Sequence, residues 1–150
     1  MKRRSVLLML LLPACSAPTK PPVDPAVCQQ ISEFGSYGCA DVRGQVLTGG
    51  GHPLAGAEVG VMGPVDPTLP VLLNRIYVRT DAAGRYTVRV NRFSPPLGQP
   101  DTLSMWVRAL VQPPLGVPTP ADSVVAVLEF SPVGTRAKVA DAPDITIPLP

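Results

Sequence analysis

Residues 103–111 read Leu-Ser-Met-Trp-Val-Arg-Ala-Leu-Val, and every second residue of this stretch, from Leu103 to Val111, is apolar. A period of two sends alternate side chains to opposite faces of a β-strand. The stretch therefore predicts a strand with one face in a protein core. The same period, or a short continuous apolar run, recurs in six further segments: 42–46, 57–61, 76–80, 85–91, 124–130 and 145–149.

Composition favours strands over helices. The chain has 150 residues, enough for one domain of ordinary size, and 20 of them are proline. A proline inside a helix removes a hydrogen bond and clashes with the preceding turn, so prolines spread along the chain disfavour long helices. Short strands broken by Gly and Pro are typical of sandwiches. We predict an all-β fold, a seven-stranded antiparallel β-sandwich over residues 41–150.

The first 15 residues have the features of an export signal. Three basic residues at positions 2–4 precede an apolar run at 6–12, which is too short to cross ~30 Å of hydrocarbon. The run ends in Leu12-Pro13-Ala14-Cys15, which resembles the lipobox of bacterial lipoproteins. That resemblance implies cleavage after residue 14 and lipid attachment to Cys15. An ordinary secretory signal with a coincidental cysteine stays open as the alternative.

Residues 15–40 are predicted to tether the domain to a membrane. The stretch 16–27 holds four prolines and no apolar period, which favours an extended chain. Ser16, directly after the lipobox cysteine, favours the outer membrane of the cell envelope, with the periplasmic or the surface face left open. Without the three basic residues of the leader, the 13 Lys and Arg are reduced to about the number of the 11 Asp and Glu. This balance argues against a nucleic-acid partner.

Two cysteines, Cys28 and Cys39, are left once Cys15 carries lipid. Export to an oxidising compartment makes a disulfide between them the leading interpretation. A structural zinc site would need more ligands, because His52 is the one histidine available to join them. We therefore predict a Cys28–Cys39 disulfide and neither a metal nor another cofactor.

Two motifs carry a family resemblance. Pro53-Leu-Ala-Gly-Ala57, after an expected strand, and Thr80-Asp-Ala-Ala-Gly-Arg-Tyr86 resemble the carboxypeptidase regulatory-like domain. The resemblance implies a transthyretin-like, seven-stranded sandwich and a non-catalytic module on a secreted or surface protein. Asp81 and Gly84 further predict a tight hairpin between strands 76–80 and 85–91, with Gly84 at positive φ.

A non-catalytic role is also what the residue counts favour. Enzymes of similar fold need ligand sets that include at least two histidines: a zinc carboxypeptidase two His and a Glu, an intradiol dioxygenase two Tyr and two His on iron. This chain has one histidine. We therefore expect a membrane-tethered module, not an enzyme, that binds an envelope protein or glycan. The alternative is a small envelope enzyme or transport accessory with an unrecognised carboxylate site, since 11 Asp and Glu leave that open.

A possible binding surface is marked by one tryptophan and three arginines. Trp106 alternates with the predicted core residues and lies two positions from Arg108, while Arg79 and Arg89 occupy outward positions of other strands. Tryptophan and arginine are favoured at interfaces. The alternative, which we favour, is that a bulge turns Trp106 inward or a Pro-rich loop covers it.

Overall fold

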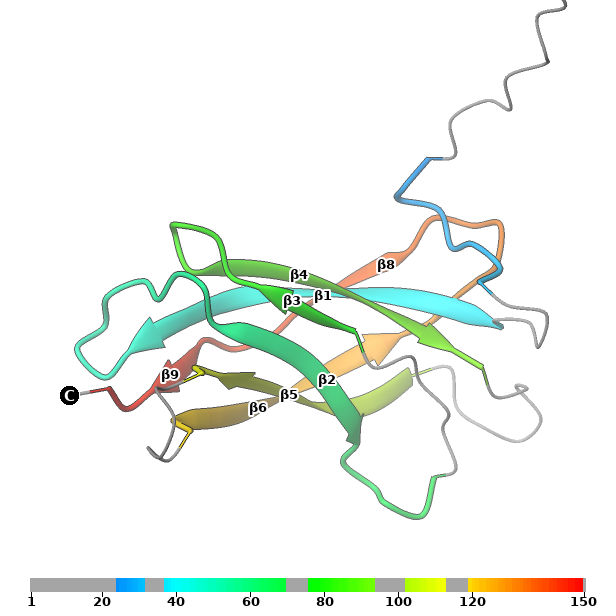
Figure 1. Ribbon diagram of the computed structural model, residues 1–150. Coiled ribbons are helices and arrows are strands. Elements are labelled where there is room, and N and C mark those ends of the chain that lie inside the picture. Colours follow the sequence, from blue (N-terminus) through cyan, green and yellow to red (C-terminus); the bar gives the residue numbers. More distant parts are fainter. Residues whose placement is uncertain (1–23, 32–36, 70–75, 94–101, 113–118, 150) are drawn as a thin grey trace, which may run out of the picture.

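The computed structural model describes residues 24–31, 37–69, 76–93, 102–112 and 119–149. Within these ranges the chain is all β, with nine strands and no helix. The described residues accordingly include no helix long and apolar enough to cross a membrane. Figure 1 shows two layers, one with β1, β4 and β8 and the other with β2, β5 and β6. The predicted sandwich is confirmed.

The strands form one sheet of five and one of four. The five-stranded sheet is built around β1, which pairs with β4 on one side and with the three short C-terminal strands on the other. Its strands are β1 (Gly38–Thr48), β4 (Arg85–Arg92), β7 (Ser131–Pro132), β8 (Lys138–Asp141) and β9 (Ile145–Ile147). The four-stranded sheet has the order β3 (Tyr77–Arg79), β2 (Glu58–Pro64), β5 (Thr102–Leu110) and β6 (Ala121–Glu129).

The core lies between the sheets and follows the predicted alternation. In β5 the apolar stripe is buried, while the residues between its members are exposed. The facing strands β1 and β4 bury Val42 and Val88, which are direct cross-strand neighbours. Removing such apolar surface from water is the main stabilising contribution to a domain of this size. The largest fully buried side chains are Leu103, Met105, Leu128, Ile145, Ile147, Val42, Val46, Val59, Val88, Val90, Val107 and Asn91.

The number and direction of the strands correct the prediction. All seven predicted strands are present, but β7 and β8 were not predicted, and β8 and β9 run parallel to β1. The sheet is therefore mixed, not wholly antiparallel. In β8 Ala140 is partly buried and the other three residues are exposed. The strand therefore has no alternation of buried apolar and exposed polar residues that the sequence analysis could detect. Strand direction is a property of pairing, which a local pattern does not encode.

The connection at residues 80–86 is a turn between sheets and not a hairpin. β3 pairs with β2, whereas β4 pairs with β1, so the predicted hairpin is wrong. The turn chemistry is as expected: the Asp81 carboxylate accepts hydrogen bonds from the N–H groups of Ala83 and Arg85, each at 2.9 Å. Gly84 has a φ of +71°, the left-handed region that favours glycine.

Thr80 joins the two sequence motifs to each other. Its hydroxyl accepts a hydrogen bond from the N–H of Ala57 at 3.0 Å and donates one to the carbonyl of Leu54 at 2.6 Å. The backbone of Thr80 also bonds to Gly56 and Ala57. Thr80 is 6 % exposed, so these bonds are shielded from water. The turn after β3 is thereby held against the segment that leads into β2.

Candidate functional site

A recess lies where β8 ends and β9 begins. β8 pairs with β1 up to the Arg43–Asp141 pair, and β9 pairs with β1 from Val46 onward. Gly44 lies between these two ladders. Its strand partner among the described residues is Tyr86, in β4. The recess, here called the Gly44 pocket, has a volume of about 270 Å³. It is lined by Arg43, Gly44, Gln45, Arg85, Tyr86, Thr87, Asp141 and Asp144.

One side of the Gly44 pocket is an ion pair. Arg43 donates through Nε to one carboxylate oxygen of Asp141 and through Nη2 to the other, the latter at 3.3 Å. The hydrogen bond from Arg43 lowers the pKa of Asp141, and the same contact raises the pKa of Arg43. Both groups therefore stay charged around neutral pH and are already engaged with each other.

Tyr86 is one of the residues that line the Gly44 pocket. The residue is 5 % exposed, and its hydroxyl is buried without a hydrogen-bond partner among the described residues. A Cβ atom at Gly44 would be 2.5 Å from that hydroxyl oxygen, so the phenol fits there because position 44 has no side chain. Burial, and then the negative charge of Asp144, raise the pKa of Tyr86 to about 12. Tyr86 is therefore a hydrogen-bond donor at neutral pH.

Two opposite charges of the Gly44 pocket are free within the described part of the chain. Neither Arg85 nor Asp144 forms an ion pair with another described residue. Gln45, by contrast, donates its amide to the carbonyl of Ala83 at 2.8 Å. The lining thus includes a free guanidinium and a free carboxylate, and the buried hydroxyl of Tyr86 lies nearby, against Gly44. This set suits a small polar molecule that offers oxygen acceptors.

The predicted binding surface is split between the two sheets. Trp106, Arg108 and Arg79 lie on the outward face of the four-stranded sheet, and Trp106 is 40 % exposed, contrary to the inward turn that we favoured. Arg89 lies in β4 of the other sheet. It donates to both carboxylate oxygens of Asp41 at 2.8 Å. Arg89 is therefore no part of a surface with Trp106.

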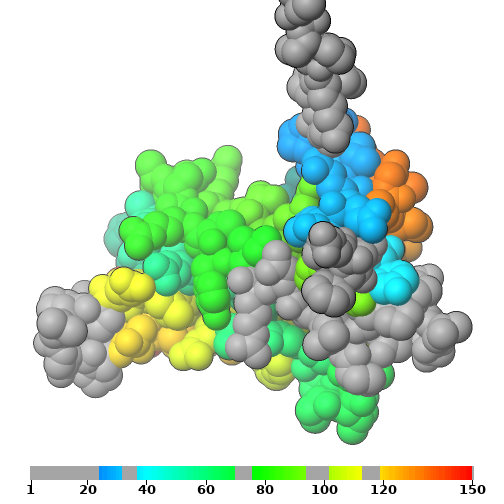
Figure 2. Space-filling view, turned by 45° about the vertical axis from the view of Figure 1, so that its right-hand side comes forward, coloured from blue at the N-terminus to red at the C-terminus, as the bar shows by residue number. Residues whose placement is uncertain are grey.

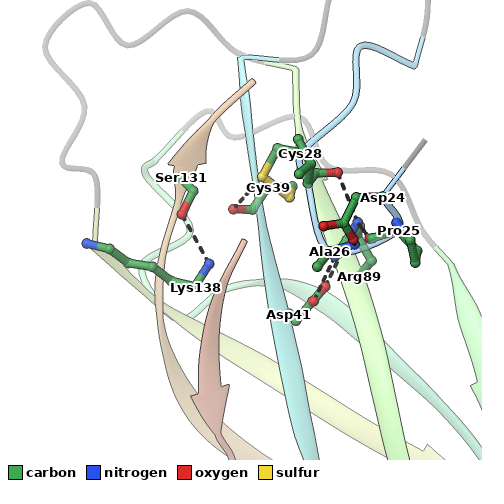
Figure 3. Close-up of polar contacts among 10 residues, drawn as sticks. Asp24, Pro25, Ala26, Cys28, Cys39, Asp41, Arg89, Ser131 and Lys138 are labelled. Carbon is green, nitrogen blue, oxygen red and sulfur yellow. Dashed lines mark hydrogen bonds and ion pairs between the residues drawn. A yellow bond between two sulfur atoms is a disulfide. The ribbon is translucent and has the colours of Figure 1, made fainter. Parts of the chain in front are cut away.

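Arg89 instead holds the N-terminal segment. Figure 3 shows its guanidinium between Asp41 and the segment 24–28, where it donates to the carbonyls of Pro25 and Val27. The predicted Cys28–Cys39 disulfide is present, with a Cα–Cα distance of 5.4 Å. Figure 2 shows the blue N-terminal segment against the orange segment that carries Thr135, whose carbonyl accepts from the Cys28 N–H at 2.8 Å. Cys15 lies outside the described residues.

The described residues offer no group of three or more His, Cys, Asp or Glu arranged to hold a metal ion. His52 lies on an exposed turn, where its backbone N–H donates a hydrogen bond to the hydroxyl of Thr48 at 3.2 Å. The carboxylate of Asp81 accepts hydrogen bonds from backbone N–H groups of its turn, as described above.

The sequence analysis missed the Gly44 pocket. The one available signal was a glycine and a tyrosine on the core faces of two predicted strands, where Gly44 leaves room for a large partner. The sequence analysis did not single out Asp141 or Asp144, and Asp141 lies in β8, opposite Arg43. Their approach depends on the parallel pairing of β8 with β1, which was not predicted.

Comparisons with known proteins give matches among solved structures alone: no family model and no curated protein matches this chain. The dioxygenase domain of a dioxygenase–carbohydrate-binding fusion from Streptomyces sp. SirexAA-E is 20 % identical, with a TM-score of 0.41, over 88 % of this chain and 96 % of that one. 3-Chlorocatechol 1,2-dioxygenase from Rhodococcus opacus 1CP is 17 % identical, with a TM-score of 0.40, over 87 % and 68 %. Catechol 1,2-dioxygenase from Pseudomonas arvilla C-1 is 15 % identical, with a TM-score of 0.37, over 81 % and 56 %.

The similar structures are enzymes, contrary to the expectation of a non-catalytic module. At these identities and TM-scores the likeness assigns no activity to this chain. The iron site of two Tyr and two His that we associate with intradiol dioxygenases does not fit here, since the sequence has one histidine and it lies on an exposed turn.

Proposed function

We propose that this chain is a cell-envelope enzyme that acts on a small, oxygen-rich polar substrate in the Gly44 pocket. Asp144 is the pocket carboxylate that is not committed to an ion pair, and it serves as the proton acceptor. Arg85 binds an anionic or electron-rich group of the substrate. Tyr86, whose pKa of about 12 keeps it protonated, donates a hydrogen bond to a substrate oxygen that gains negative charge.

The observation that carries this proposal is the buried hydroxyl of Tyr86. A buried polar group without a hydrogen bond costs about 1–3 kcal/mol. This hydroxyl has no partner among the described residues and lies against the core side of Gly44, and both residues line the pocket. A substrate oxygen bound there would recover the cost. Such a group calls for an explanation, and a role in binding or catalysis is one that fits a residue of the pocket lining.

The proposal is tested with the full chain and a panel of sugars, sugar acids and amino acids. Thermal shifts identify a binder, since a ligand at a hundred times its Kd raises the free energy of unfolding by about 2.7 kcal/mol. NMR of the ligand then follows turnover. We expect Asp144→Asn to abolish turnover while binding persists, and Arg85→Gln to weaken binding about tenfold or more.

Asp122→Asn is the matched control, because Asp122 is an exposed carboxylate outside the pocket lining. If Arg85→Gln and Tyr86→Phe both bind the ligand as tightly as the parent does, the ligand lies elsewhere and the site is refuted. Binding without turnover would refute the enzymatic part of the proposal.

We also propose that the chain is held at the envelope membrane by lipid on Cys15, with the outer membrane as its location. The support is the basic start, the apolar run and the lipobox-like Leu12–Cys15 in that order. Anchoring takes more than one acyl chain, because each buried CH₂ contributes only ~0.8 kcal/mol. Cys15→Ala should move the protein to the soluble envelope fraction or leave it uncleaved. Unchanged membrane partitioning of that variant would refute the anchor.

The likeness to carboxypeptidase regulatory-like domains is retained as a proposal about ancestry. Its support is that the two motifs which carry the likeness contact each other through Thr80. A crystal structure of the full chain in which these segments are apart would refute it.

A further inference from the structure

The outward face of the four-stranded sheet carries an exposed apolar strip. Trp106 in β5 is 40 % exposed, and its cross-strand neighbours are Gly63 in β2 and Val125 in β6. Val127, two residues further along β6 on the same face, is 59 % exposed. Glycine on one side and short aliphatic side chains on the other leave the indole accessible.

A second aromatic ring lies flat on the same face. Tyr77 in β3 is 48 % exposed, and a Cβ atom at its neighbour Gly60 would be 2.6 Å from its ring. The ring therefore rests over the glycine, and its hydroxyl lies 3.7 Å from the sulfur of Met62. On the other side of Gly60 is Arg108. The face thus carries two aromatic rings and an arginine.

The charged residues on this outward face form ion pairs, with Arg108 as the exception among the described residues. The outward acidic residues of its strands are Glu58, which binds Arg79 at 3.2 Å, and Glu129, which pairs with Lys138. Arg108 forms no ion pair with a described residue. It lies two residues from Trp106 on the same strand face, about 6.6 Å along the strand. The guanidinium of Arg108 is therefore free to pair with an anionic group that lies next to the indole of Trp106.

We propose that this face, defined by Trp106, Arg108 and Tyr77, binds an acidic polysaccharide. The C–H face of a pyranose ring packs on exposed aromatic rings, and a sugar carboxylate pairs with a guanidinium through two hydrogen bonds. An extended glycan suits an exposed sheet face, whereas peptides are usually bound at strand edges or in grooves. One free cation on a nearly neutral chain is too little for nucleic acid. The surface is on the other sheet from the Gly44 pocket, so it stands independently of the proposed enzyme.

The test compares polygalacturonate with its fully methyl-esterified form, which has the same backbone without the charge. Binding of the full chain is measured at low and physiological salt. Alginate and hyaluronate extend the panel of acidic glycans, while polyglutamate and anionic phospholipid vesicles serve as anionic probes that are not sugars. We expect an acidic glycan to bind, and the esterified polymer to bind about tenfold more weakly than polygalacturonate.

Variants separate the two contributions. Trp106→Ala should weaken binding of both forms of the polymer about tenfold. Arg108→Gln should weaken binding of the acidic form and leave the esterified form unchanged. Arg136→Gln removes the same charge from an exposed position at the N-terminal segment and should change neither.

Several results would overturn the proposal. These are no binding to any of the three acidic glycans, equal binding to polyglutamate, preference for the vesicles, or binding that survives both Trp106→Ala and Arg108→Gln. Circular dichroism of each variant shows whether the sandwich is intact. A destabilised Trp106→Ala is replaced by Trp106→Leu, for which the same weakening is expected.

Discussion

The hydroxyl of Tyr86 in β4 lies against Gly44 in β1, so close that a Cβ atom at position 44 would be 2.5 Å from the oxygen. The two residues are direct partners in the antiparallel ladder, and the pocket lies beside both. Because the phenol is buried, it has little room to move aside. The small size of residue 44 and the large size of residue 86 therefore depend on each other.

The first prediction follows from this contact. Gly44→Ala should force the Tyr86 ring to shift and should lower the free energy of unfolding by about 1–3 kcal/mol, as overpacking of a core does. Chemical denaturation measures the loss. Gly50→Ala is the control, because a Cβ atom there meets its nearest neighbour at 3.5 Å, an ordinary contact. Equal losses at both positions would contradict the packing of Tyr86 on Gly44.

Tyr86→Phe separates stability from function. The substitution removes a buried hydroxyl that has no partner among the described residues, so the free energy of unfolding at pH 7 should stay the same or rise by about 1 kcal/mol. Ligand affinity of the Gly44 pocket should fall. A variant that loses more than about 1 kcal/mol of stability would show that the hydroxyl is a structural group.

The same residue predicts a loss of stability at high pH. The pKa of Tyr86 is raised from 10.0 to about 12 in the folded chain. Between these values the folded state keeps a proton that the unfolded state releases, so stability is full below pH 10 and falls as the pH rises toward 12. Across two pH units the loss is about 2–3 kcal/mol. Urea unfolding at pH 9 to 11.5 should show this slope in the parent and a shallower one in Tyr86→Phe.

Gly84→Val should destabilise the turn between β3 and β4. Gly84 has a φ of +71°, and a Cβ atom there would be 2.5 Å from the carbonyl oxygen of Val46. Left-handed backbone costs a β-branched residue about 1–2 kcal/mol before the clash is counted. The Tm should fall by at least several degrees. Gly50→Val should cost much less, and a similar fall in both variants would contradict the turn geometry.

Thr80→Val tests the contact between the two sequence motifs. Valine has nearly the shape of threonine, but it would leave the Leu54 carbonyl and the Ala57 N–H without their hydroxyl partner. We expect a loss of about 1–3 kcal/mol in denaturant unfolding. Thr87→Val, at an exposed position of β4, should stay within about 0.5 kcal/mol of the parent. The reverse order of effects would argue against the Thr80 contact.

Arg89→Gln should loosen the N-terminal segment and leave the disulfide in place. Arg89 donates to the carbonyls of Pro25 and Val27, and its loss leaves that segment held by fewer bonds. Hydrogen exchange of the peptide 24–31, followed by mass spectrometry, should become faster while exchange in β5 stays the same. Arg79→Gln, which breaks an exposed ion pair with Glu58, is the control. Unchanged exchange at 24–31 would show that the disulfide and the backbone bonds suffice.

Much of the fold was predictable because it depends on neighbouring residues. The stripe of β5 and the core faces of β1 and β4 are buried as the period of two predicted. The disulfide was predictable from the cysteine count and the inferred export. Gly84 was predictable because its turn chemistry lies within a few residues.

The pocket and the binding face were harder to predict, because they need a register. Whether Trp106 faces solvent depends on which side of β5 meets the core, and a shift of one residue reverses it. Arg89 was grouped with Arg79 and Arg108 because all three take outward positions. Only the sheet assignment shows that Arg89 lies on the other layer, against Asp41.

The sequence by itself determined seven of the strand segments and their buried stripes, the disulfide partners and the turn glycine, because each of these follows from residues close along the chain or from a count. Only the tertiary structure decided that β3 and β4 belong to different sheets and that β8 runs parallel to β1. It brings Asp141 to Arg43 across 98 residues of chain and leaves the recess beside Gly44 and Tyr86. The physical reason is that backbone hydrogen bonds between strands are alike for every sequence, so the choice of partner depends on how all the side chains of the core pack together.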